Sequence, residues 1–167
     1  MAVARVAGGG IVTAVPDVHQ PPFRRAVIAV NGASSDARIV RLACQAARAS
    51  KAQVIAVHVV EIDWSLPLEA DVASRSEDAQ RVLDVVEGIA ESEHQAVETV
   101  LLQARDVGAA LVDEASERAA DLLILGLPYR KRFGGDFAIG RTIPYVFSNA
   151  PCAVWVVREP INETARG

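Results

Sequence analysis

The sequence has few aromatic residues. Only 5% of its 167 residues are Phe, Trp or Tyr, although apolar residues together make up 51%. The apolar excess is therefore mostly alanine and valine, whose small side chains suit close packing of helices on a sheet. A chain of this length corresponds to one domain and can bury a core without disulfides or metals.

Cysteine is almost absent, and histidine is scarce. Cys44 lies in an alanine-rich helical pattern and Cys152 just before an apolar run, so we expect buried free thiols rather than a disulfide. His19, His58 and His94 do not have the spacing of metal ligands, and we expect no metal site. His58 falls inside a predicted strand, where a hydrogen-bonded structural histidine is expected.

The sequence also lacks an excess of positive charge and any long apolar run. Lys and Arg number 17 against 21 Asp and Glu, a net charge of −4, which gives no argument for a nucleic-acid partner. No run approaches the length of a membrane span, and the first residues lack the features of a signal peptide. We therefore expect a cytoplasmic domain. No pattern of catalytic residues is apparent, so we expect a protein that is not an enzyme.

The chain divides into three segments. Residues 1–22 contain Gly8 to Gly10 and Pro16, which interrupt any periodicity, and we interpret them as a flexible tether. Residues 23–160 carry the apolar patterns of a compact domain. Residues 161–167 are expected to form a tail.

Strand and helix patterns alternate through residues 23–160. Short Val- and Ile-rich runs predict strands at 24–32, 52–61, 96–103, 122–125 and 153–157. The helices between them have the apolar positions Ile39, Leu42, Ala43 and Ala46; Val82, Val85, Val86 and Ile89; Ala110, Leu111 and Ala115; and Ile143, Val146 and Phe147. Ser34 to Asp36, Ser74 and Asp106 are predicted to cap the first three helices. This alternation predicts an α/β fold, a doubly wound, Rossmann-like parallel sheet with helices on both faces.

The segment from Asp121 to Thr142 contains a possible anion site. A buried strand is followed by a loop with three cations (130–132) and glycines at 134, 135 and 140, and then by a helix start. Free N–H groups at a helix N-terminus favour a phosphate, and glycines let it approach the backbone. A long surface loop with a solvated basic tip is the alternative. In doubly wound sheets, ligands bind beyond the strand ends where the winding reverses, which brings this loop near Ala29, Val30 and Asn31.

Several stretches resemble the universal stress protein family over about residues 24–158. AVIAVNG is similar to the family's first strand, AVHVVE to its second, and NAPCAVWVVR to its HAPCPVLVV ending. The resemblance implies a five-stranded sheet in the order 3-2-1-4-5. The loop from Pro128 to Thr142 resembles that of family domains fused to the cytoplasmic ends of amino-acid and cation transporters.

Nucleotide-binding members of that family carry the pattern Gly-x2-Gly-x9-Gly-Ser/Thr after the fourth strand. Gly126 matches the first glycine and Gly140 the last, but Tyr129 takes the place of the second, and ten residues separate it from Gly140. Arg141 replaces the Ser/Thr and is followed by Thr142. Asn31 stands where nucleotide binders have an aspartate.

The resemblance implies an adenine nucleotide, ATP, AMP or a cyclic nucleotide, as the ligand. The residues expected to bind it are Ala29, Val30, Asn31, Val59, Gly126, Pro128, Tyr129, Gly140, Arg141 and Thr142. A domain of this kind would act as a sensor, and a membrane transporter is a possible partner. Weak ATP hydrolysis ranks last among the hypotheses, because no base or metal-binding carboxylate is evident.

The fifth predicted strand suggests a homodimer. An apolar strand at a sheet edge favours pairing with a second copy, and family members that dimerise there support this interpretation. The residues concerned are Val154, Trp155, Val156 and Val157. The alternative to a sensor is a dimerisation scaffold whose pocket is degenerate, and it would be favoured if Tyr129 filled the place of the missing glycine.

Overall fold

The computed structural model describes residues 22–48, 50–65, 73–128 and 139–160. Strands and helices alternate along the chain as predicted. The elements are β1 (Arg25–Val30), α1 (Asp36–Arg48), β2 (Gln53–Glu61), α2 (Ala73–Ser92), β3 (Val97–Ala104), α3 (Val107–Glu117), β4 (Leu122–Leu127), α4 (Thr142–Asn149) and β5 (Ala153–Arg158). Residues 1–21 of the predicted tether, the predicted tail, Tyr129 and the three cations at 130–132 lie outside the described residues.

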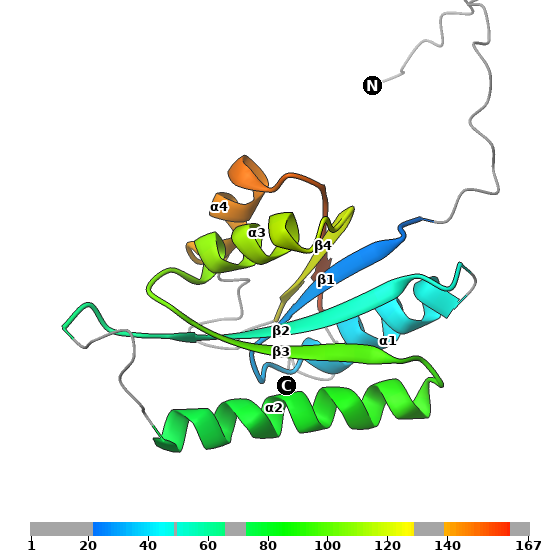
Figure 1. The fold of residues 1–167 in the computed structure, drawn as a ribbon, viewed down its shortest axis with the longest axis horizontal. Coiled ribbons are helices and arrows are strands. Elements are labelled where there is room, and N and C mark those ends of the chain that lie inside the picture. The colour runs from blue at the N-terminus through cyan, green and yellow to red at the C-terminus, as the bar shows by residue number, and fades with distance from the viewer. Residues whose placement is uncertain (1–21, 49, 66–72, 129–138, 161–167) are drawn as a thin grey trace, which may run out of the picture.

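The five strands form one parallel sheet in the order β3-β2-β1-β4-β5, which confirms the predicted fold class and strand order. Helices α1 and α2 cover one face of the sheet, and α3 and α4 cover the other (Figure 1). The winding reverses between β1 and β4. The carboxyl ends of these two strands therefore mark the switch point, where ligands of such sheets bind.

The central strands are buried on both faces. Val27 and Ile28 in β1, and Leu123 and Ile124 in β4, have no exposed surface. Successive side chains of a strand point to opposite faces, so both faces must be covered by helices. The edge strands β3 and β5 are only half-buried. The near-continuous apolar runs of β1 and β4 are the sequence signature of this central position.

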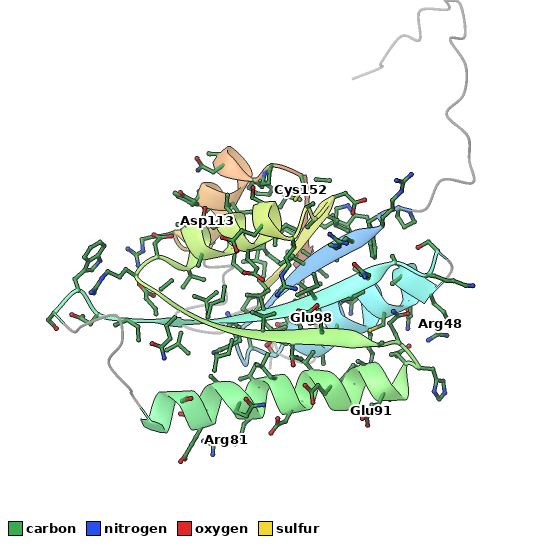
Figure 2. The ribbon with its side chains drawn as sticks, in the orientation of Figure 1. Arg48, Arg81, Glu91, Glu98, Asp113 and Cys152 are labelled. Atoms are coloured by element: carbon green, nitrogen blue, oxygen red, sulfur yellow. The ribbon has the colours of Figure 1, made fainter. Side chains whose placement is uncertain are left out.

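The predicted buried stripe of α2 was wrong at Val85. Its side chain is 61% exposed, whereas Leu83, absent from the prediction, is buried. The buried positions recur every three or four residues at Ala79, Leu83, Val86 and Ala90. Two of these buried residues are alanines. A prediction based on the larger valine side chains therefore places the buried face of α2 on the wrong side of Val86. The opposite face carries Arg81 and Glu91, which point away from the sheet (Figure 2).

Two other predicted core residues also proved to be partly solvent-exposed. Leu42 is 37% exposed, because it lies outside the buried side of α1. That side is formed by Ile39, Val40, Ala43, Cys44 and Ala47. Phe147 in α4 is 59% exposed. This short helix buries only Ile143 and Val146, and Phe147, one residue beyond Val146, points away from the sheet.

Both cysteines are free, as predicted: Cys44 is buried and Cys152 half-buried. Burial raises the pKa of each thiol, and Asp121 near Cys152 and Glu93 near Cys44 add to the effect. Within the described ranges, no helix is both long and apolar enough to cross a membrane.

Candidate functional site

A cavity of about 240 Å³ lies at the switch point. It opens on the α3/α4 face of the sheet, beyond the carboxyl ends of β1, β2 and β4. Its floor is apolar and comes from the strands and α3, while its rim is formed by the turn after β1 and the start of α4. We call it the switch-point cavity. Its lining residues are Ala29, Val30, Asn31, Ser35, Asp36, Val57, Val59, Val107, Leu111, Leu125, Gly126, Leu127, Pro128, Ile139, Gly140, Thr142 and Ile143.

Most residues predicted to bind the ligand line this cavity. They are Ala29, Val30, Asn31, Val59, Gly126, Pro128, Gly140 and Thr142. Arg141 lies between two lining residues but is not part of the wall, and Tyr129 is outside the described residues. The structure thus brings together side chains from four separate segments of the chain.

The sequence analysis found Ala29 and Val59 but missed the other apolar residues of the floor, among them Val57, Val107 and Leu111. Val57 precedes the predicted Val59 by two residues, so both side chains point to the same face of β2, a signal that could have identified Val57. Val107 and Leu111 come from the first turns of α3. No local pattern links them to the site, because only the packing of α3 over β1 and β2 brings them there.

The turn after β1 is fixed by two polar side chains. The Asp36 Oδ2 atom accepts hydrogen bonds from the backbone N–H groups of Asn31 and Gly32, at 2.9 and 2.7 Å. The Asn31 Oδ1 atom accepts one from the Ala33 N–H at 3.0 Å. Gly32 has φ +79°, which other residues rarely adopt. The side chain at the predicted ligand-binding position 31 therefore has a structural partner within its own turn.

The predicted role of Asp36 as a helix cap was wrong. Its carboxylate reaches back to the turn. Within the first turn of α1, the N–H groups of Arg38 and Ile39 donate to the carbonyl oxygen of Ser35. Burial raises the pKa of Asp36 above its ordinary value, and the N–H groups of Asn31 and Gly32 only partly oppose this effect. The prediction for Asp106 is confirmed, because its Oδ1 atom accepts from the Ala109 N–H at 2.9 Å.

Gly126 allows β4 to approach the same turn closely. A Cβ atom added at Gly126 would lie 2.5 Å from Ser35 Oγ and 2.9 Å from Ser35 Cβ. Neither contact is compatible with normal packing. The glycine is therefore required where β4 meets the start of α1, at the wall of the cavity.

The other rim of the cavity is the N-terminus of α4. Gly140 has φ +62°, and the helix begins at Thr142, so free backbone N–H groups face this end of the cavity. Arg141 caps the helix without a side-chain hydrogen bond to it. Its guanidinium Nη2 instead donates to Glu61 Oε1 at 2.9 Å, and the Arg141 side chain is 82% exposed.

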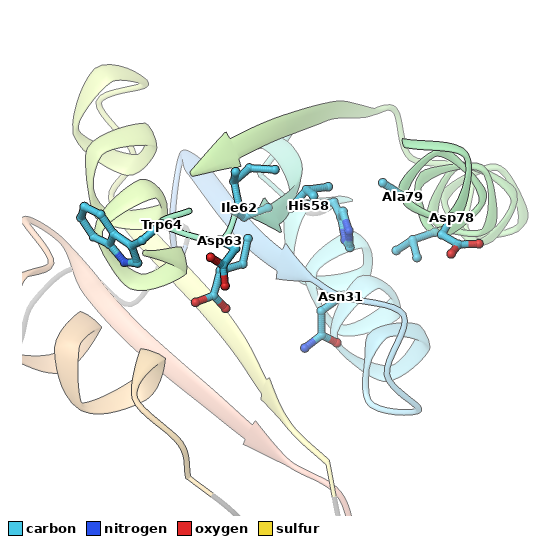
Figure 3. A pocket seen from close by; sticks show the side chains of 11 residues that line it. Asn31, His58, Ile62, Asp63, Trp64, Asp78 and Ala79 are labelled. Atoms are coloured by element: carbon cyan, nitrogen blue, oxygen red, sulfur yellow. The ribbon is translucent and has the colours of Figure 1, made fainter. Parts of the chain in front are cut away.

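A larger cavity of about 580 Å³ lies between the end of β2 and α2 (Figure 3). It shares Asn31 and Val59 with the switch-point cavity and is lined further by His58, Asp63, Trp64 and Asp78, among others. The His58 Nδ1 atom lies 2.9 Å from the Val30 carbonyl oxygen, to which it donates, as expected of a structural histidine. Asp63 Oδ1 accepts from the backbone N–H and hydroxyl of Ser65, at 2.8 and 2.7 Å.

In the part of the chain that the structure describes, no three His, Cys, Asp or Glu side chains gather in a way that could hold a metal ion. The lining of the switch-point cavity combines an apolar floor with polar side chains, such as Asn31 and Asp36, and a helix N-terminus at one end. An apolar slot accepts a flat ring, and a helix N-terminus favours an anion.

Comparison with known proteins agrees with this architecture. The sequence profile of the Universal stress protein family matches residues 22–158. The chain belongs to this family. No curated protein gives a significant match.

Solved universal stress proteins share the fold at low sequence identity. One in complex with cAMP is 21% identical over 81% of this chain and 97% of its own, with a TM-score of 0.62. The Archaeoglobus fulgidus protein in complex with dAMP is 23% identical, covers 81% and 98%, and has a TM-score of 0.61. An Arabidopsis thaliana protein with AMP bound is 16% identical, covers 84% and 94%, and has a TM-score of 0.61.

Proposed function

We propose that this universal stress protein domain binds an adenine nucleotide in the switch-point cavity and acts as a sensor rather than as an enzyme. The adenine ring would lie in the apolar slot near Val30, Asn31 and Val59. The phosphate would lie at the N-terminus of α4, near Gly140 and Thr142. The observation that carries the proposal is the convergence of these residues, from β1, β2 and the segment before α4, on one cavity.

The physical character of the cavity supports this assignment. Ala29, Val57 and Leu125 make its floor apolar, which suits an aromatic base. The N–H groups of Thr142 and Ile143, in a first turn whose third residue, Pro144, has none, would supply donors for phosphate oxygens, and the helix dipole would add to their effect. The three solved relatives with cAMP, dAMP and AMP give the nucleotide class independent support.

A thermal-unfolding screen against AMP, ATP, cyclic AMP and cyclic di-AMP tests the proposal. A ligand at a hundredfold excess over its dissociation constant should stabilise the fold by about 2.7 kcal/mol. The same ligand should lose its effect in Ala29→Leu, which fills the floor of the cavity, and weaken in Thr142→Ala. Absence of a shift with every nucleotide would overturn the proposal.

A variant outside the cavity provides the control. Thr99 lies on the edge strand β3, where its Oγ1 atom donates to Glu87 at 2.8 Å. Thr99→Ala removes the same hydroxyl as Thr142→Ala but at a distant site. It should therefore leave nucleotide binding unchanged, and each variant should be compared by its shift on adding ligand.

A second candidate function is dimerisation without a ligand. β5 is an edge strand whose outer side has no partner strand among the described elements, and its side chains are only partly buried. We propose that two copies pair along Val154 to Val157. Light scattering coupled to gel filtration tests this proposal, and a monomer at every micromolar concentration would refute it.

We further propose that the sensor works in the cytoplasm and passes its signal to a membrane transporter, on the resemblance of the loop from Pro128 to Thr142. Adding the domain and its nucleotide to a reconstituted candidate transporter should change the rate of uptake. Equal rates with and without the nucleotide would remove this part of the proposal and leave nucleotide binding itself intact.

A further inference from the structure

An ion pair lies at the edge of the switch-point cavity, and its acidic partner, Glu61, lines the larger neighbouring cavity. Arg141 Nη2 lies 2.9 Å from Glu61 Oε1, and the two side chains are 82% and 50% exposed. Glu61 ends β2, and Arg141 immediately precedes α4. The pair therefore joins the end of β2 to the start of α4, the helix that follows β4 in the chain.

Both partners lie next to residues that line the cavity. Glu61 follows the lining residue Val59 by two positions, so its side chain points to the same face of β2, about 6.7 Å further along the strand. Arg141 lies between the lining residues Gly140 and Thr142. A phosphate at the start of α4 would therefore approach the guanidinium of Arg141 and the carboxylate of Glu61 that is paired with it.

We propose that Glu61 determines the charge selectivity of this site and disfavours ligands with a long phosphate chain. This inference rests on the proposed function, since it concerns the phosphate end of the same nucleotide. Glu61 opposes phosphate binding in two ways: it competes for the Arg141 guanidinium, and its own negative charge repels each phosphate that is added.

Because the ion pair is exposed, the effect of Glu61 should increase step by step with the number of phosphate groups on the ligand. An exposed ion pair contributes little to stability, so a single phosphate can replace Glu61 as the partner of Arg141. The displaced carboxylate remains on the rim, where its repulsion grows with the number of phosphate charges. Adenosine has no phosphate and should not respond to Glu61 at all.

Calorimetric titration of the full chain with adenosine, AMP and ATP, without divalent cations, tests the inference in wild type and in Glu61→Gln. The substitution keeps the size of the side chain and removes its charge. Binding of ATP should become about threefold to tenfold tighter, that of AMP less so, and that of adenosine should not change. The gain for ATP should shrink in about 0.5 M salt, because salt screens exposed charges.

Glu98→Gln is the matched control. Glu98 is also an exposed strand glutamate, 53% exposed, and pairs with an arginine, Arg118, at 2.6 Å, but it lies near the start of β3 at the opposite end of the sheet. This variant should bind all three ligands as wild type does. Thermal unfolding without ligand checks that both variants fold.

The outcomes separate the two proposals. If Glu61→Gln changes the affinity for adenosine, AMP and ATP by one common factor, or changes none, the charge selectivity is refuted while nucleotide binding stands. If neither wild type nor the variant binds any of the three, both proposals fail. A gain for ATP that is unaffected by salt would also refute the electrostatic role of Glu61.

Discussion

Gly126 in β4 packs directly against Ser35, which lies just before α1. A Cβ atom at position 126 would lie 2.5 Å from Ser35 Oγ. The sequence suggested that Gly126 matches a glycine of a nucleotide-binding pattern. The structure gives this glycine a packing role as well, because Ser35 is buried and cannot move into solvent.

Gly126→Ala should destabilise the domain by about 1–3 kcal/mol, since overpacking a buried contact forces side chains or backbone to shift. Urea denaturation measures the effect. Ser35→Gly should restore more of the loss than Ser35→Ala, because the alanine keeps the Cβ atom, 2.9 Å from the added methyl group. Equal stability of Gly126→Ala and wild type would show that the turn adapts without strain.

Asp36→Ala should destabilise the domain by about 2 kcal/mol, because the N–H groups of Asn31 and Gly32 lose the charged, buried carboxylate that accepts both hydrogen bonds. Asp36→Asn should lose much less stability than Asp36→Ala. Both bonds go to a single oxygen, Oδ2, which the amide oxygen can replace. Urea denaturation of the two variants gives the comparison.

The stability of wild type relative to Asp36→Asn should also depend on pH. The pKa of Asp36 is raised in the folded state, mainly by burial, so the native carboxyl binds a proton more readily than the unfolded one. Its contribution to stability is complete below the ordinary value, about 3.9, and is lost as pH rises through the raised value. Wild type should therefore gain stability relative to Asp36→Asn as pH falls from 7 toward 4. A pH-independent difference would contradict the raised pKa.

Substitutions in α2 test which face of this helix is buried. Leu83 is 3% exposed and Val85 61% exposed. Leu83→Ala should destabilise the fold by about 2–5 kcal/mol, as expected for a buried leucine. Val85→Ala should change the stability by no more than about 0.5 kcal/mol, as at other surface positions. Similar losses at both positions would indicate that α2 is rotated or that another surface covers Val85.

Proline substitutions in β5 test pairing at its outer edge. The N–H groups of Ala153 and Glu159 donate to β4, to the carbonyl oxygens of Asp121 and Leu127. Alternation along the strand then directs the N–H of Trp155 to β4 and that of Val156 away from it. Val156→Pro should therefore leave the fold intact and convert a dimer into a monomer.

Trp155→Pro is the contrasting variant. It removes a hydrogen bond of the sheet itself and also the indole ring that packs edge-on against Phe23, with centroids 6.2 Å apart. It should lower the melting temperature, whereas Val156→Pro should change mainly the mass measured by light scattering. A dimeric Val156→Pro variant would rule out pairing along β5.

Local pattern predicted the elements of this domain well and their faces less well. The runs of β1 and β4 are apolar throughout because both faces of these strands are buried, which makes them easy to identify. The buried face of each helix was harder to predict. In α1 and α2, small residues such as Ala47 and Ala79 occupy the buried stripe, while Leu42 and Val85 lie outside it.

The sequence by itself determined the alternation of strands and helices, the parallel sheet, and the loop and strand ends around which the candidate site is built. It could do so because periodicity and glycine position act over a few residues. Only the tertiary structure decided that Asp36 turns back to hold Asn31 and Gly32, and that Glu61 meets Arg141. The Glu61–Arg141 contact joins the end of β2 to the start of α4, and Asp36 joins α1 to the turn before it. Both depend on how the sheet brings separate segments together.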